Sequence, residues 1–226
     1  MTEFTFNMAF RCQLQEDAHL YGEVTFLESV LCPGMTVIDG GANRGVTTIA
    51  IARAVGSKSH VYAFEPVPEY FASLQGNISR NGIGNTSVYN LGLSNKTGSV
   101  PFYKHGEGSG ITPADNSEKI QVDAITIPEF LTVHSIPKLD FINLDCEGSE
   151  LLVLQSAQAV LLEQTPMIFC EVHRDYLKAL DQSVEDLVMF LTNLGYGVKP
   201  IQVEDLKTPS DFGRCSHVYA SMGLNH

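Results

Sequence analysis

Residues 37–45 read VIDGGANRG, and this stretch decides the fold. It begins with the β-branched residues Val37 and Ile38, passes through Asp39 and ends in a turn that is rich in glycine. Residues 46–55 follow at once and are rich in alanine and isoleucine, which is typical of a compact helix. A strand, a glycine turn and a helix in this order indicate the first unit of an α/β domain.

The same alternation of strand and helix continues along the chain. We predict further strands at 60–65, 87–91, 139–145 and 167–172, and helices at 68–80, from about 149, and at 184–194. The last two predicted strands, 196–203 and 217–222, are joined by a turn and indicate an antiparallel hairpin at one edge. Parallel strands joined by helices are covered on both faces. The sequence therefore predicts a doubly wound α/β sheet whose ligand lies at the carboxyl ends of the strands.

Two regions depart from this alternation. We predict that residues 1–34 form a helical extension, because apolar residues recur at helical spacing over 16–31, and that residues 35–226 form the α/β domain. Residues 99–103 include a proline and indicate an edge strand. Residues 105–119 are polar and contain several glycines, so we predict a long exposed loop that acts as a lid over the ligand.

Composition excludes several classes of function. The chain has 14 Lys and Arg against 26 Asp and Glu, which gives a formal charge of −12 and argues against nucleic acid binding. No apolar run approaches the roughly 18 residues of a membrane span, and the N-terminal residues lack a signal-peptide pattern. The five cysteines are scattered, so we expect free thiols, a reducing compartment and a cytoplasmic location.

The glycine turn is the first candidate ligand site. Gly40, Gly41 and Gly45 let the backbone approach a ligand closely, and Asn43 lies between them. Asp39 would repel a pyrophosphate but attract an ammonium or sulfonium group. The spacing also departs from the G-x-G-x-x-G pattern of dinucleotide-binding proteins. A positively charged cofactor therefore fits this turn, and the alternative is an ordinary strand-to-helix connection.

Two later strand ends supply the other predicted cofactor contacts. Glu65 ends the second predicted strand, where an acid can accept hydrogen bonds from both ribose hydroxyls of an adenosine cofactor, and Pro66 follows it. Gly92 and Leu93 follow the third predicted strand, where an adenine ring would lie. The alternatives are a solvated carboxylate at a strand end and a plain turn.

Four motifs occur in order between residues 23 and 173, namely VIDGGANRG, YAFEP, LDFINLDCEGSELLVL and IFCEVH. Through these motifs the sequence resembles the FkbM-type methyltransferases. The resemblance implies the class I methyltransferase fold, a Rossmann-like sheet of seven strands with one reversed, and S-adenosyl-L-methionine as cofactor. It also implies methylation of an oxygen, often a hydroxyl group of a sugar or natural product. Family members usually carry a lysine two residues before Asp145, where this chain has Asn143.

Asp145, Glu171 and His173, at the ends of two neighbouring strands, are the candidate catalytic group, and Glu147 lies beside Asp145 in the sequence. Asp145 ends the strand at 139–145 and Glu147 follows it, at the rim where the methyl group would lie, so we expect Asp145 to face the cofactor or the acceptor. Glu171 and His173 end the next strand and share one face, because they are two residues apart. His173 is the candidate general base, with Glu171 setting its tautomer or pKa. Glu147 has capping of the following helix as its alternative role.

Asp145, Glu171 and His173 could also hold a divalent cation, but no spacing demands one, and we expect a site without metal. The sequence predicts methylation of a hydroxyl group on a small polar acceptor, dependent on S-adenosylmethionine. A nicotinamide-dependent oxidoreductase and a non-catalytic module that binds S-adenosylmethionine are the alternatives. We expect neither a membrane nor a nucleic acid partner. Whether the protein forms a homo-oligomer stays open, because the N-terminal helix could cover the site of its own subunit or of a partner.

Overall fold

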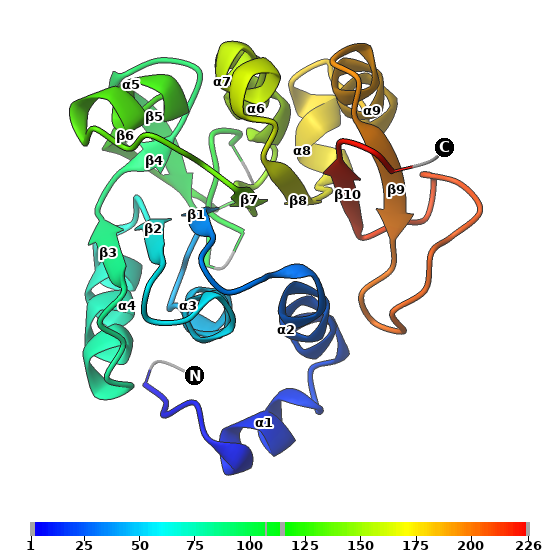
Figure 1. Cartoon of the computed structure of the whole chain (residues 1–226). Coiled ribbons are helices and arrows are strands. Elements are labelled where there is room, and N and C mark those ends of the chain that lie inside the picture. Colours follow the sequence, from blue (N-terminus) through cyan, green and yellow to red (C-terminus); the bar gives the residue numbers. More distant parts are fainter. Residues whose placement is uncertain (1–2, 107, 114–115, 225–226) are drawn as a thin grey trace.

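The computed structural model describes residues 3–106, 108–113 and 116–224, and its centre is a sheet of seven strands (Figure 1). The strand order is β3-β2-β1-β7-β8-β10-β9. Strand β10 runs antiparallel to both of its neighbours, and the other neighbouring pairs are parallel. This topology confirms the predicted doubly wound sheet with one reversed strand. The strands are β1 Thr36–Gly40, β2 His60–Phe64, β3 Thr86–Tyr89, β7 Phe141–Leu144, β8 Met167–Glu171, β9 Gly197–Ile201 and β10 His217–Ser221.

Helices cover both faces of this sheet (Figure 1). Helices α2, α3 and α4 lie on one face with α1 outside them, and α5, α6, α7 and α9 lie on the other. Their bounds, with those of α8, are α1 Met8–Leu14, α2 Ala18–Val30, α3 Val46–Val55, α4 Pro68–Arg80, α5 Ile127–Val133, α6 Glu150–Ser156, α7 Gln158–Gln164, α8 Arg174–Ala179 and α9 Val184–Asn193. Among the described residues, no helix combines the length and hydrophobicity that crossing a membrane requires.

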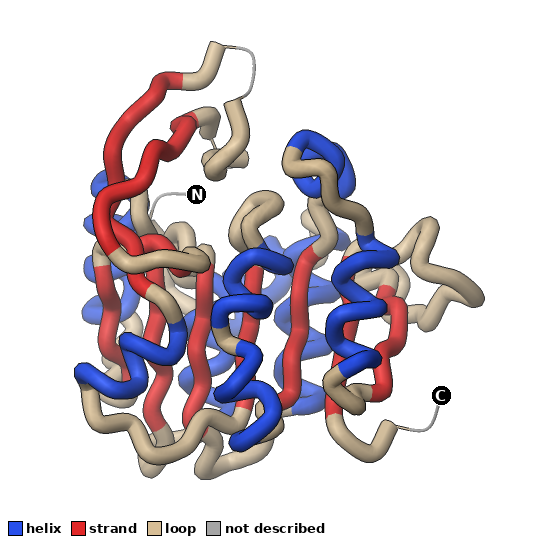
Figure 2. The backbone as a smooth tube through the Cα atoms, turned by 90° about the horizontal axis from the view of Figure 1, so that it is seen from above, coloured by secondary structure: helices blue, strands red, loops and turns tan. Residues whose placement is uncertain are grey.

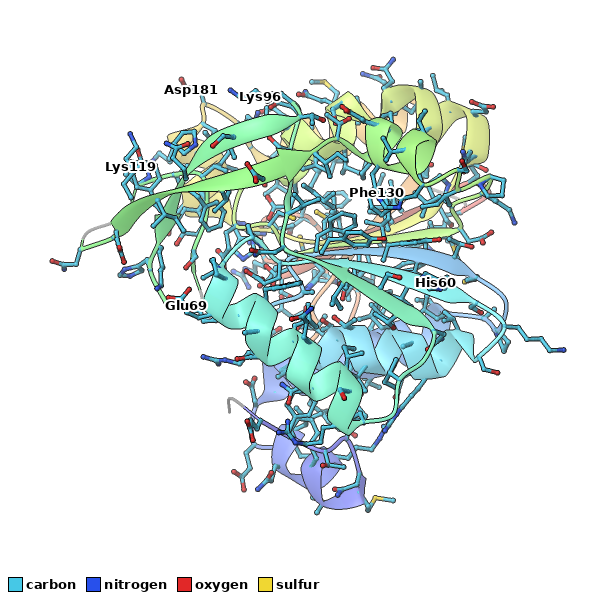
Figure 3. All side chains as sticks on the ribbon, turned by 90° about the vertical axis from the view of Figure 1, so that its left-hand side faces the viewer. His60, Glu69, Lys96, Lys119, Phe130 and Asp181 are labelled. Carbon is cyan, nitrogen blue, oxygen red and sulfur yellow. The ribbon has the colours of Figure 1, made fainter. Side chains whose placement is uncertain are left out.

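Aromatic side chains join the helices to the sheet. Phe130 points from α5 towards the strands and is fully buried (Figure 3), and its ring centroid lies 4.7 Å from that of Phe64 on β2. On the other face, Phe26 of α2 stacks on Phe169 of β8 at a centroid distance of 4.5 Å. Helix α2 therefore packs directly on the sheet, and the predicted domain boundary at residue 34 stays a prediction.

A second, smaller sheet forms an arm beside the first. Its order is β4-β6-β5, with β4 at Gly92–Leu93, β5 at Gly98–Lys104 and β6 at Glu118–Ile125. The two longer strands project beyond the ends of the seven-stranded sheet (Figure 2). The predicted strand at 99–103 is confirmed as an edge strand, but of this second sheet. The predicted loop at 105–119 was wrong at its end, because residues 118–125 alternate between exposed and buried positions and form β6.

Three residues of the turn directly after β1 have positive φ angles. Gly41 has φ +83°, Asn43 has φ +46° and Gly45 has φ +89°, all in the left-handed region. Gly41 is also crowded, because a Cβ atom there would lie 1.7 Å from the carbonyl oxygen of Asp145. The loop after β1 and the loop after β7 are therefore pressed together at the carboxyl ends of two adjacent parallel strands. Only glycine allows this contact.

Candidate active site

Two adjoining cavities open at the carboxyl ends of the parallel strands. The first lies between the loop after β1 and the arm, and the second lies between that loop and helices α1 and α2. The second has a volume of about 470 Å³, which is in the range of small-molecule sites. Four residues line both cavities and so mark their junction: Gly41, Asn43, Asp145 and Glu147.

The first cavity brings together most of the predicted cofactor residues. Those lining it are Gly41, Asn43, Glu65, Pro66, Gly92, Leu93 and Asp145. Gly45 lines the second cavity instead. Gly40 lies behind the loop, where a Cβ atom would meet the side chain of Leu93 at 2.7 Å. The arm supplies the apolar wall of the first cavity through Val100, Phe102, Val122 and Ala124. We did not assign these four residues to the site from the sequence.

Glu65 is held in place by backbone amides. Its two carboxylate oxygens accept hydrogen bonds from the amides of Asn43 and Val67, both at 2.8 Å. The side chain is buried, and burial raises its pKa to about 7 although both hydrogen bonds act in the opposite direction. A carboxylate has about four acceptor positions. Glu65 therefore keeps acceptor capacity for further donors in the first cavity.

Asp39 occupies a different place from the one predicted. Its carboxylate is buried inside the domain and does not line either cavity. It accepts hydrogen bonds from the Thr48 hydroxyl at 2.6 Å and from the Asn143 side-chain amide at 2.8 Å. Burial raises the pKa of Asp39, and these two donors lower it. Asp39 thus fixes the base of the glycine loop to α3 and β7 rather than facing a ligand.

The position of Asn143 leads to a stability prediction. We expect Asn143→Leu to lower the free energy of unfolding by about 1–3 kcal/mol, because it removes a donor from a buried carboxylate. Urea unfolding measures this difference. Asn193→Leu, at an exposed position on α9, is the control and should change stability far less. Equal effects of the two substitutions would show that the hydrogen bond to Asp39 contributes nothing.

Glu150 organises the loop after β7, whereas the sequence pattern predicted for it only a place at the start of a helix. Its Oε1 atom accepts hydrogen bonds from the amides of Cys146 at 3.1 Å and Gly148 at 3.0 Å. The same atom lies 3.0 Å from Nδ1 of His173. Ser149 occupies the N-cap of α6 without a side-chain cap bond, so Glu147 is free of the capping role considered above.

His173 lies among four carboxylates. Its Nε2 atom is 3.3 Å from Glu147, 3.5 Å from Asp145 and 3.7 Å from Glu171, while Nδ1 faces Glu150. Burial lowers the pKa of His173, but the hydrogen bond to Glu150 and the surrounding negative charges outweigh it and raise the pKa to about 9. The ring is therefore protonated at neutral pH, which does not suit the predicted general base. Glu150, and not Glu171, contacts the ring at Nδ1.

Glu147 and Asp145 face the junction of the two cavities. Burial raises the pKa of Glu147 to about 7, against the lowering effect of His173. The backbone of Glu147 has φ +48°, a conformation that non-glycine residues rarely adopt and that often marks functional sites. Burial and the charge of Glu171 also raise the pKa of Asp145. Carboxylates with raised pKa values are suited to accepting a proton near neutral pH.

The predicted lid touches both sides of the site. The Tyr70 hydroxyl of α4 donates to the Gly106 carbonyl at 2.7 Å, and the Tyr176 hydroxyl of α8 donates to the Gly108 carbonyl at 3.0 Å. Ser109 lines the first cavity, as does Ile111. Of the other lid residues, His105 is exposed, Thr112 is buried and Glu107 lies outside the described residues.

The N-terminal helices cover the site of their own chain. The second cavity is bounded on one side by Phe10, Gln13, Leu14, Asp17, His19, Leu20 and Glu23 from α1, α2 and the turn between them. Arg44, Glu171 and His173 lie among the residues on the opposite side. The wall of the second cavity therefore includes the N-terminal segment of the same chain, which is one of the two arrangements that we considered from the sequence.

The sheet order, the glycine loop after β1 and the acid after β2 together define a class I methyltransferase fold. Residues 39–198 match the methyltransferase FkbM domain. The chain belongs to this family, as its motifs predicted.

Similar proteins include one of known sequence and two of known structure. "Methyltransferase 1" of the fungus Beauveria bassiana is 22% identical over 169 residues, which cover 63% of this chain and 68% of that protein. The methyltransferase FkbM of Methylobacillus flagellatus KT is 19% identical with a TM-score of 0.56, over 90% of this chain and 52% of that one. This chain thus spans about half the length of the Methylobacillus protein. An O-methyltransferase of Bacillus cereus, in complex with SAH, is 12% identical with a TM-score of 0.53, over 95% and 89% of the chains.

Proposed function

We propose that this protein transfers a methyl group from S-adenosylmethionine to a hydroxyl group of a small polar acceptor. The observation that carries the proposal is the junction of the two cavities, where Asp145 and Glu147 line both. A cofactor in the first cavity and an acceptor in the second would meet there. The Bacillus cereus neighbour, an O-methyltransferase in complex with SAH, supports the same chemistry for this fold.

The residues that line the first cavity suit the chemical groups of the proposed cofactor. Two acceptor atoms, Oδ1 of Asn43 and Oδ1 of Asp145, are buried and accept no hydrogen bond from the described residues. Both suit the ammonium group of a methionine moiety. Gly41 gives the backbone clearance for close approach, and Glu65 has acceptor capacity for the ribose hydroxyls. Leu93 and the apolar wall of the arm suit an adenine ring.

The chain's own residues account for the rest of the reaction. The bound cofactor supplies an electrophilic methyl group for in-line displacement. Glu147 accepts the proton that the acceptor hydroxyl loses, and Glu150 holds the loop that positions it. His173 keeps its proton and balances the charge of the neighbouring carboxylates. The lid and helix α2 exclude water from the junction.

Charge and thiol chemistry support the remaining parts of the proposal. The excess of acidic residues does not favour a nucleic acid or an anionic membrane surface as acceptor. All five cysteines are free thiols, and three of them are exposed or half-buried. This pattern suits a reducing compartment, and we infer a cytoplasmic location.

Calorimetric titration with S-adenosylmethionine, and separately with NAD, tests the proposal. We expect micromolar binding of S-adenosylmethionine alone, and release of S-adenosylhomocysteine when the right hydroxylated compound is added. Because a protonated Glu65 accepts hydrogen bonds poorly, affinity should fall up to about tenfold for each pH unit below the pKa of about 7.

Two variants distinguish the effect of Glu65 protonation on cofactor affinity from the effect of other groups that titrate near neutral pH. Glu65→Gln should bind S-adenosylmethionine more weakly at pH 7 and lose the dependence on pH. Glu147→Gln should keep that dependence, because its side chain faces the junction rather than the ribose position. Binding of NAD alone, or a pH dependence that survives in Glu65→Gln, would contradict the cofactor assignment.

A further inference from the structure

A second group of potential ligands lies next to the proposed catalytic residues, and three of its four members line the second cavity. His19 and Glu23 of α2, Glu171 at the end of β8 and His217 at the start of β10 each offer one nitrogen or oxygen atom to this group. These four atoms lie within 4.8 Å of one another. His19 and Glu23 are four residues apart on one helix and therefore share a face.

The two imidazole rings are oriented as metal ligands are. Nε2 of His19 lies 3.1 Å from Glu171, and Nε2 of His217 lies 3.1 Å from Glu23, so both Nε2 atoms face inward. Nδ1 of His19 is held from outside by Glu204 at 2.9 Å. A metal-bound histidine usually contacts a carboxylate or another oxygen through its second nitrogen in this way, which fixes the ring and its tautomer.

The position of His217 is fixed from two further directions. Its Nδ1 atom lies 3.1 Å from the Ser216 hydroxyl. Its ring stacks on Phe169 at a centroid distance of 4.4 Å and an interplanar angle of 7°. Only 1% of the His217 side chain and 9% of the Glu23 side chain are exposed. His217 and Glu23 are thus buried, while the side chains of His19 and Glu171 are more exposed.

We propose that these four side chains bind one divalent first-row transition metal ion, with zinc as the best match. Two imidazoles and two carboxylates form a tetrahedral donor set that zinc accepts, whereas magnesium and calcium prefer oxygen ligands alone. Bonds of about 2.1 Å place tetrahedral donors roughly 3.4 Å apart, so the four atoms need to move together by only about 1 Å.

The ion would join helix α2 to β8 and β10 at the wall of the second cavity. His19, Glu23 and Glu171 line that cavity, and His217 lies behind them. The ion would therefore hold the N-terminal helices in the position that closes the acceptor site. The methyl transfer described above does not involve it, so failure of either proposal leaves the other intact.

Zinc binding to the full chain, stripped of metal with a chelator, tests the site. Zinc is titrated in competition with a chromophoric chelator, and cobalt is then used as a probe whose absorption reports a tetrahedral site. We expect one zinc ion per chain. His19→Gln, at a partly exposed position that tolerates substitution, should weaken zinc binding by at least about tenfold. Glu204→Gln should weaken it about tenfold through the loss of support for His19.

Two controls make the outcome decisive. His134→Gln removes an exposed histidine directly after α5 and should leave zinc affinity unchanged. Asp145→Asn tests the neighbouring group of Asp145, Glu171 and His173, which could also gather around an ion. The proposal is overturned if no zinc binds, if His19→Gln binds zinc as tightly as the unmodified chain, or if Asp145→Asn alone abolishes binding.

Discussion

Glu147→Gln is expected to lower the turnover number of methyl transfer by about 10²–10⁴-fold, the usual contribution of a general base. The glutamine side chain has nearly the same shape, so the strained backbone of the loop is unchanged, but the amide cannot accept the acceptor's proton. The affinity for S-adenosylmethionine should stay almost constant, because Glu147 faces the junction and the contacts assigned to the cofactor come from other residues.

Steady-state kinetics combined with calorimetric titration distinguish the possible roles of this residue. A loss in turnover without a loss in cofactor affinity identifies a group that acts only in the chemical step. Glu163→Gln, on the exposed side of α7, is the matched control and should keep full activity. If Glu147→Gln loses affinity and turnover equally, Glu147 holds the cofactor and another group takes the proton.

Gly41→Ala should be among the most destabilising single substitutions in the chain. The new methyl group would enter the left-handed region of the backbone, which costs about 1–2 kcal/mol. It would also lie 1.7 Å from the carbonyl oxygen of Asp145, so the two loops must separate. We expect a total loss of about 2–5 kcal/mol in unfolding free energy, together with loss of cofactor binding.

Gly56→Ala separates the two contributions. Gly56 has φ +78°, close to that of Gly41, but a Cβ atom there would meet nothing within 4 Å. Urea unfolding of both variants should therefore give the cost of the backbone conformation from Gly56→Ala, and the cost of crowding from the difference. Equal destabilisation by the two substitutions would mean that the loops tolerate separation.

Local patterns were sufficient to predict the elements that form the centre of the fold. The helices at 46–55 and 68–80 have the predicted bounds, because a glycine turn or a proline sets each start. Helix α1 lies within the predicted helical extension but had no predicted bounds, and α5 and α8 were missed because they have only seven and six residues. Strand β6 was missed although its buried residues alternate, because polar residues interrupt them.

The site was harder to predict than the fold, because its contacts join distant parts of the chain. The order of motifs places Glu65, Asp145 and Glu171 at strand ends, and this is visible in the sequence. The direction in which the Asp39 side chain points is not visible in the sequence, because β1 is covered on both faces and either face can receive a carboxylate. The partners of Glu171 on α2 and β10 lie more than one hundred residues apart in the chain, and no local pattern connects them.

The place of β10 in the sheet has a consequence for synthesis on the ribosome. This strand is made after both β8 and β9, yet it lies between them and pairs with both. Until residues 217–221 have emerged, those two strands each have an edge with unpaired amide and carbonyl groups, which attract other β-strands. The nascent chain therefore passes through a stage in which the sheet lacks the strand between β8 and β9. Pairing of β10 with both strands then covers the two edges that could attract other β-strands.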